Sequence, residues 1–169
     1  MAFCALLGEG TVADWSALYL QGTLHTNAGL AAGGFAAFSL MMALGRLVGD
    51  HLTAVWGPVV LAQRSGLLAA GGLGIALLIP HPVVALIGYA LFGVGLSCIF
   101  PIVLRAAGHL KHIQETAAIA AVSTIGYTGF LAGPPMIGLL AEGLTLRGAL
   151  GVVVMLTFLM AFVAGNIEQ

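Results

Sequence analysis

Residues 65–104 decide the fold class, and they read SGLLAAGGLGIALLIPHPVVALIGYALFGVGLSCIFPIVL. The stretch contains no Asp, Glu, Lys or Arg, and one Pro80-His81-Pro82 step interrupts it. About 20 apolar residues suffice for one membrane-spanning helix, and two prolines this close end one helix and start another. The stretch therefore predicts two consecutive transmembrane helices joined by a tight turn.

The rest of the chain repeats this pattern. Residues 15–45, 116–141 and 148–167 also lack Asp, Glu, Lys and Arg, and each window has room for a span of about 20 residues. We expect an all-α membrane protein whose whole length, 1–169, forms one bundle of six transmembrane helices. The expected helices cover about 2–20, 28–46, 58–79, 83–106, 116–140 and 148–165. The short connections make sequential helices antiparallel neighbours.

Composition argues against a soluble domain. The chain has 169 residues, of which 60% are hydrophobic and 7% charged, whereas an ordinary globular domain carries about 25% charged residues. The net charge is -1 without a basic patch, so nucleic acid is not an expected partner. Cys4 and Cys98 lie in apolar runs and suit neither a disulfide framework nor a metal site. We expect the lipid bilayer as the surroundings, and no cofactor.

The positions of Lys and Arg predict an orientation. Arg46 and Arg64 flank the second expected connection, Arg105 and Lys111 the fourth, and only Arg147 lies on the other side. The positive-inside rule therefore places connections two and four, with the C-terminus, in the cytoplasm. The first basic residue is Arg46, so a secretory signal is not expected. Because apolar sequence follows Met1 directly, we expect the chain to be part of a longer protein.

The strongest local signal is Gly45-Arg46-Leu47-Val48-Gly49-Asp50-His51-Leu52, followed by Gly57. It falls between the second and third expected helices, on the cytoplasmic side. Arg46 and Asp50 are four residues apart and can pair across one helical turn. The alternative interpretation is a solvated turn with an arginine placed by the positive-inside rule.

This stretch resembles the conserved loop motif of the major facilitator superfamily, found between the second and third helices of each six-helix half. The fourth expected helix carries Gly93-Val94-Gly95 and Phe100-Pro101, as the fourth helix of such C-terminal halves often does. The fifth carries Gly129-Phe130-Leu131-Ala132-Gly133-Pro134, which is similar to the superfamily's Gly-x-x-x-Gly-Pro element. Residues 9–16 look like the seventh helix of a poorly characterised branch of bacterial permeases.

The resemblance implies the C-terminal six-helix half of a twelve-helix secondary transporter in the bacterial inner membrane. It implies that Arg46 and Asp50 latch helices on the cytoplasmic face, with close approach at Gly45 and Gly49. Helix packing or a hinge is implied at Gly129, Gly133 and Pro134. The sequence departs from the family at His51, at Pro58 and at Gly138, which lies one place later than in the strict antiporter form. These departures speak against a drug–proton antiporter.

Glu9 and Asp14 are the main candidates for transport chemistry. A carboxylate inside a span costs about 2.5–3.5 kcal/mol and usually faces a partner or a cavity. The two residues are about 140° apart around the helix and do not share a face. We expect a proton or the substrate at one or both; the alternative is a structural hydrogen-bonding residue or a rim group.

Arg105 is either a positive-inside anchor or an inward-facing charge that pairs with a carboxylate or an anionic substrate. Trp15 and Tyr19 share one helix face and are expected to anchor the outer membrane interface. Ser39, Ser97 and Ser123 lack a local His–acid pair, and no nucleotide-binding glycine loop is present. The sequence therefore does not predict an enzyme.

The favoured function is half of a transporter that moves a small solute by alternating access, driven by a proton or another ion. Such a half needs a partner, which would be the missing N-terminal six-helix half or a second copy. The alternative is a non-transporting, truncated membrane protein or helical interaction partner.

Overall fold

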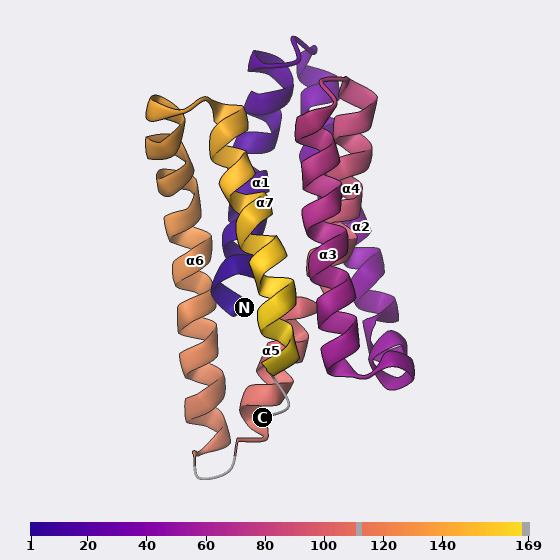
Figure 1. Ribbon diagram of the computed structural model, residues 1–169, viewed down its shortest axis with the longest axis vertical. Helices are drawn as coiled ribbons and strands as arrows, with labels where there is room; N and C mark the ends of the chain where they lie inside the picture. Colours follow the sequence, from indigo (N-terminus) through magenta and orange to yellow (C-terminus); the bar gives the residue numbers. More distant parts are fainter. Residues whose placement is uncertain (111–112, 167–169) are drawn as a thin grey trace.

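The computed structural model describes residues 1–110 and 113–166, and within them all regular structure is helical (Figure 1). This agrees with the predicted all-α class. The elements are α1 (Ala2–Gly22), α2 (Ala28–Trp56), α3 (Pro58–Leu78), α4 (Pro82–Ser97), α5 (Ile99–Gly108), α6 (Glu115–Gly143), α7 (Leu146–Val163) and the 3₁₀ turn η1 (Ala164–Asn166).

Five segments are long and apolar enough to cross a membrane: α2, α3, α4 together with α5, α6, and α7. The remaining long helix, α1, has 21 residues but is less apolar, because it carries Glu9 and Asp14. It packs against α6, α2 and α7, and also touches α4. A helix covered by protein on most sides does not need an apolar surface all round. With α1 counted, the bundle has the six spans expected from the sequence.

The helix ends follow from local chemistry. Asn27 caps α2, since its side chain accepts a hydrogen bond from the Leu30 backbone N–H at 2.9 Å. Gly57 ends α2 in a positive-φ conformation, and Pro58 begins α3 immediately. His81 caps α4, whose first residue is Pro82. Thr145 caps α7 by accepting from the Gly148 N–H.

Helix α2 is longer than predicted. Charged residues begin near residue 46, which predicts the end of the helix there, but the helix continues to Trp56. Neither proline nor a positive-φ glycine occurs before Gly57, so nothing in the backbone stops the helix. Its 29 residues span about 43 Å, which exceeds the hydrocarbon core of about 30 Å. The loop motif therefore lies in the last turns of a helix and not in a connection.

The fourth predicted helix is divided in two. Helix α4 ends at Ser97 and α5 begins at Ile99, with Cys98 between them. Pro101 has no N–H to donate to the Ser97 carbonyl four residues earlier, which weakens the ladder at this point. The Ser97 hydroxyl instead donates back to the Val94 carbonyl at 2.7 Å. The break lies directly opposite the loop motif of α2.

The helices cross closely where one of them carries glycine. A Cβ on Gly88 or Gly72 would fall 2.5–2.9 Å from backbone atoms of the facing helix in the α3–α4 crossing. Gly93 of α4 abuts the Phe38 carbonyl of α2. The large side chains of Phe38 and Phe92 fill the space beside this crossing, with ring centroids 5.7 Å apart. These contacts hold α2, α3 and α4 together as one side of the bundle (Figure 1).

Candidate transport site on α1

Helix α1 lies between α2 and α6 and keeps one strip of its surface open. The strip contains half-buried Ala13 and Ala17 and exposed Gln21. On the opposite side, α1 buries Gly8 against Phe92 of α4. The two carboxylates lie at the two edges of the open strip, Glu9 next to α2 and Asp14 next to α6. Their separation around the helix agrees with the angle expected from their spacing.

Glu9 pairs with the loop motif. Its carboxylate Oε2 lies 3.6 Å from Nη2 of Arg46 on α2. Both side chains are partly accessible, with 28% of the Glu9 side chain and 49% of the Arg46 side chain exposed. Arg46 also donates to the Met42 sulfur on its own helix. Glu9 of the first helix thus contacts Arg46, for which the family resemblance implies only a role in a cytoplasmic latch.

Arg105 of α5 pairs with Asp50 of α2, with Nη2 to Oδ1 at 2.5 Å. The spacing of four residues predicts that Arg46 and Asp50 can pair with each other. In the structure each finds a partner on another helix, because the side chains of Glu9 and Arg105 reach α2 from either side. Arg105 pairs with a carboxylate at the surface, with 56% of its side chain and 82% of the Asp50 side chain exposed. An inward-facing role for Arg105 stays a prediction. Four alternating charges therefore connect α1, α2 and α5.

The glycines of the loop motif are positions of close approach. A Cβ on Gly45 would overlap the Ser97 side chain of α4, and one on Gly49 would lie 3.0 Å from the Cys98 sulfur. Both glycines are buried, and they face the break between α4 and α5. The loop motif thus forms the contact surface at which α2 meets this break.

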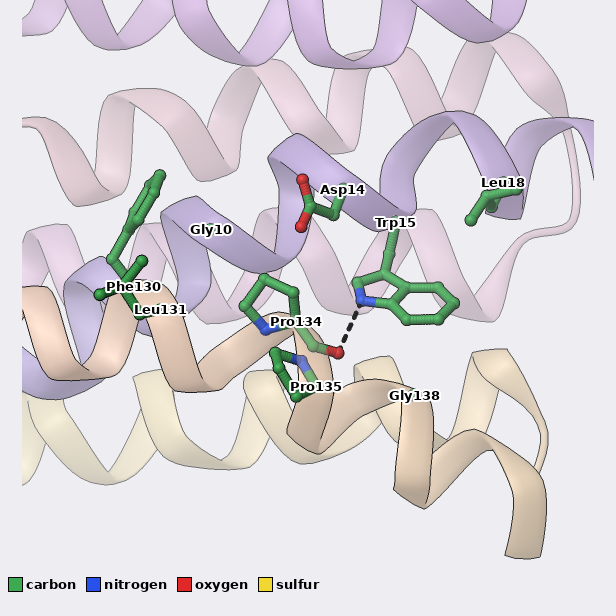
Figure 2. Close-up of a pocket in the computed structure, with 9 residues that line it drawn as sticks. All are labelled: Gly10, Asp14, Trp15, Leu18, Phe130, Leu131, Pro134, Pro135 and Gly138. Atoms are coloured by element: carbon green, nitrogen blue, oxygen red, sulfur yellow. Dashed lines mark hydrogen bonds between the residues drawn. The ribbon is translucent and has the colours of Figure 1, made fainter.

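Asp14 lines a pocket of about 510 Å³ between α1 and α6 (Figure 2). The pocket walls come from Gly10, Trp15 and Leu18 of α1 and from Phe130, Leu131, Pro134, Pro135 and Gly138 of α6. The Trp15 indole N–H donates to the Pro134 carbonyl at 3.1 Å and braces the two helices (Figure 2). Two adjacent prolines inside α6 deprive the Phe130 and Leu131 carbonyls of their usual donors.

The Gly-x-x-x-Gly-Pro element is built against α1. Gly129 abuts the Phe3 carbonyl, and a Cβ on Gly133 would lie 3.0 Å from the Leu7 carbonyl. In return, Gly10 of α1 faces the Phe130 carbonyl, where a Cβ would be 2.6 Å away. Small residues on both helices therefore let the two backbones touch. Whether Pro134 acts as a hinge stays a prediction.

Other predicted positions have different roles. Tyr19 is buried, and its hydroxyl donates to the Ala76 carbonyl at 3.4 Å, so its expected place at the membrane interface is wrong. Arg64 lies over the Trp56 ring at 4.7 Å, near the junction of α2 and α3. Arg147 lies at the other end of the bundle, at the start of α7. Lys111, which is predicted to flank a cytoplasmic connection, lies outside the described residues.

Within residues 1–110 and 113–166, no three His, Cys, Asp or Glu residues gather where they could hold a metal ion.

The contacts that the sequence did not predict join residues far apart in the chain: Glu9–Arg46, Asp50–Arg105 and Trp15–Pro134. Most of these residues could be singled out from their type and place in the sequence, but residue spacing along the chain did not predict which of them would be in contact.

Comparison with known proteins identifies relatives over nearly the whole chain. An uncharacterised MFS-type transporter of Yersinia pestis is 37% identical over 161 residues, which are 95% of this chain and 42% of that protein. Membrane protein MosC of Rhizobium meliloti is 36% identical over 150 residues, 89% of this chain and 37% of MosC. An uncharacterised transporter of Sinorhizobium fredii is 34% identical over all 169 residues, 45% of its own length. No family model matches the chain.

The chain is a homologue of part of an MFS-type transporter. This confirms the resemblance to the major facilitator superfamily and identifies a multi-pass membrane protein. The chain spans about two fifths of the length of the curated relatives it matches. That the matched part is the C-terminal half stays a prediction.

Proposed function

We propose that this chain is the C-terminal six-helix half of a secondary transporter and works by alternating access with a second six-helix half. The observation that carries the proposal is the surface on either side of Glu9 and Asp14. There α1 is open to its surroundings, and the exposed residues beside it include a row of small ones on α2, next to the exposed large side chains of Leu18 and Leu131. A lipid-facing surface favours bulky apolar side chains, whereas contacts between membrane helices favour small ones.

Helix α2 displays this contrast within one element. Ala32, Ala36, Ser39, Ala43 and Arg46 follow one another at spacings of four and three, so they share one side of the helix. Arg46 contacts Glu9, so this side of α2 adjoins the open strip of α1. The neighbouring side of α2 exposes Leu40, Leu44 and Val48 instead. The small-residue side suits a protein partner, and the bulky side suits lipid.

Helices α6 and α7 also differ in the size of the side chains that they expose. On α6, exposed Ala120 and Thr124 are small, and the same side continues with exposed Tyr127 and Leu131 toward the Asp14 pocket. In contrast, α7 exposes a row of large apolar side chains, namely Met155, Phe158, Leu159 and Phe162. We define the pairing face as the small residues on α2 (Ala32, Ala36, Ser39, Ala43) and α6 (Ala120, Thr124), which lie on either side of the open strip of α1 (Ala13, Ala17). The partner that fits the relatives' greater length is a second half of the same protein.

The charged residues suggest how a proton would drive the cycle. Arg46 lies next to Glu9 and four residues before Asp50, so it has a choice of two carboxylates. Protonation would remove the charge of Glu9 and release Arg46 toward Asp50, which in turn would weaken the Asp50–Arg105 contact. A proton at the edge of the open strip would thereby loosen the contact of α2 with α5. We place this end of the bundle, with Arg64 and Arg105, in the cytoplasm.

Cysteine accessibility tests the transport pathway without knowledge of the substrate. In the complete protein, with Cys4 and Cys98 replaced by Ala, we expect Ala17→Cys to react with a membrane-impermeant, water-soluble thiol reagent. The matched control, Met155→Cys on the lipid-facing side of α7, should not react. Equal protection of both positions would contradict a water-filled pathway beside α1 and favour a non-transporting membrane protein. Cross-links between two copies through Ala36→Cys would instead identify a second copy as the partner.

Proton coupling has its own test. Proteoliposomes that contain the complete protein should accumulate its solute under an imposed pH gradient, and Glu9→Gln should abolish that accumulation while leaving downhill exchange. Undiminished gradient-driven uptake in Glu9→Gln would rule out this role of Glu9.

A further inference from the structure

The pocket between α1 and α6 contains a negative charge without a counterion. Among residues 1–110 and 113–166, Asp14 has neither an ion-pair nor a hydrogen-bond partner, and no Arg, Lys or His lines its pocket. Glu9, five residues earlier on the same helix, is neutralised by Arg46. Asp14 is exposed and opens into this pocket, and a carboxylate without a partner on a helix of a membrane protein usually marks a place for a ligand or a coupling ion.

The polar groups of this pocket are hydrogen-bond acceptors. The one side-chain N–H in its wall, that of Trp15, is already donated to the Pro134 carbonyl. Pro134 and Pro135 cannot donate to the carbonyls of Phe130 and Leu131, and both of these residues line the pocket. The close packing of Gly10 against the Phe130 carbonyl puts that oxygen at the α1–α6 boundary. A ligand that satisfies such a wall must supply donors or positive charge.

The rest of the wall is apolar and aromatic. Leu18, the ring of Trp15 and the two proline rings surround the acceptors. The volume of about 510 Å³ falls within the range of small-molecule sites, roughly 300–1,000 Å³. A bare metal ion would leave most of this space and its apolar surface unused. An organic cation uses both, because its carbon skeleton contacts the rings and its charge meets the carboxylate.

We infer that the pocket between α1 and α6 binds a protonated organic amine, with the ammonium group donating to Asp14 and to the proline-freed carbonyls of α6. This inference rests on the proposed function in that it assigns the transported solute to the class of organic cations. The nine residues that line the pocket all belong to this chain, so the chain by itself offers the site to a ligand. Anions are disfavoured by Asp14, and a polyol can donate its hydroxyls to the acceptors but leaves the charge of Asp14 uncompensated.

Fluorescence of Trp15 reports on the pocket directly. In the Trp56→Phe variant of the chain, reconstituted in lipid nanodiscs, Trp15 is the only tryptophan. The probe is phenethylamine, which is protonated at neutral pH, and its uncharged analogue is 2-phenylethanol. We expect a saturable change of Trp15 fluorescence with phenethylamine at concentrations about tenfold lower than with 2-phenylethanol. Asp14→Asn should remove this difference.

A matched control separates a specific site from general surface charge. Glu142→Gln removes one carboxylate from the same end of α6 without altering the pocket lining, so the preference for the amine should remain. Three results would overturn the inference: equal affinity for amine and alcohol, an unchanged preference in Asp14→Asn, or an Asp14-dependent response to NaCl that exceeds the response to phenethylamine. The nanodisc titration reports on the pocket, whereas cysteine accessibility reports on the pathway beside α1. A failure of amine binding therefore leaves the transport proposal standing, and a protected Ala17→Cys leaves the amine pocket standing.

Discussion

Glu9 on α1 and Arg46 on α2 form an ion pair with 3.6 Å between Oε2 and Nη2. The pair connects two features that are 37 residues apart in the sequence: an acid within the first helix and the loop motif at the end of the second. A second pair, Asp50 with Arg105, continues the connection to α5. The loop motif is therefore more than a latch at one end of the bundle, because its arginine contacts the helix that carries both candidate transport acids.

A double-mutant cycle measures this connection. We expect Glu9→Gln, Arg46→Gln and their combination to give a coupling free energy of about 0.2–1 kcal/mol, since both side chains are partly exposed. Unfolding of the chain by SDS in mixed micelles provides the free energies. The same cycle between Glu9→Gln and Arg147→Gln should give a coupling close to zero, because Arg147 lies at the other end of the bundle and outside this charge network. Additive effects of Glu9→Gln and Arg46→Gln would contradict the pairing.

Gly45 tests the crossing of α2 and α4. The Gly45→Ala variant places a methyl group against the Ser97 side chain, and such overpacking costs about 1–3 kcal/mol. Gly71→Ala is the matched control, because nothing lies within 4 Å of its Cβ position. There alanine should be neutral or should stabilise α3 by up to about 1 kcal/mol. Thermal unfolding in detergent compares the two, and equal melting temperatures would show that α2 and α4 do not meet at Gly45.

Much of the fold could be predicted from the sequence, because charge-free windows and prolines act locally. The Pro80–Pro82 step ended α3 and began α4, and the number of spans followed from window lengths. The end of α2 could not be predicted from charge alone. Arg46 and Asp50 suggested that the helix had left the membrane, yet only the positive φ at Gly57 and the following Pro58 stop the backbone.

The candidate site was predictable only in part. Glu9, Asp14 and Arg105 were identified because charges inside apolar segments are costly. The partners of Glu9 and Arg105 were not predicted, because the spacing of four residues made Asp50 the expected partner of Arg46. The three-dimensional arrangement brings Glu9 and Arg105 to α2 from other helices. Tyr19 was predicted wrongly for the opposite reason: an aromatic residue near a helix end suggested the membrane interface, but its side chain is buried inside the bundle, where the hydroxyl reaches the Ala76 carbonyl of α3.

Trp15 tests the brace between α1 and α6. Trp15→Phe keeps an aromatic ring but loses the hydrogen bond to the Pro134 carbonyl, so we expect a loss of about 1 kcal/mol in the free energy of unfolding. Trp56→Phe is the matched control, since the Trp56 ring lies beside Arg64 at the surface and its loss should cost less. Thermal unfolding of both variants makes the comparison. A larger effect of Trp56→Phe would argue against the brace.

The paired prolines of α6 connect helix stability with ligand binding. Pro134→Ala restores an N–H that can donate to the Phe130 carbonyl, so α6 should gain about 1–3 kcal/mol of stability. The same hydrogen bond consumes an acceptor of the amine pocket, so the affinity for phenethylamine should fall several-fold, by analogy with the loss of one hydrogen bond. Pro101→Ala is the matched control, because it restores a donor for the Ser97 carbonyl in a span that does not line this pocket. Nanodisc titrations of both variants, combined with their unfolding curves, separate the two effects. If Pro101→Ala weakened amine binding as much as Pro134→Ala, the loss would reflect the bundle as a whole, and the freed carbonyl of Phe130 would have no part in recognition.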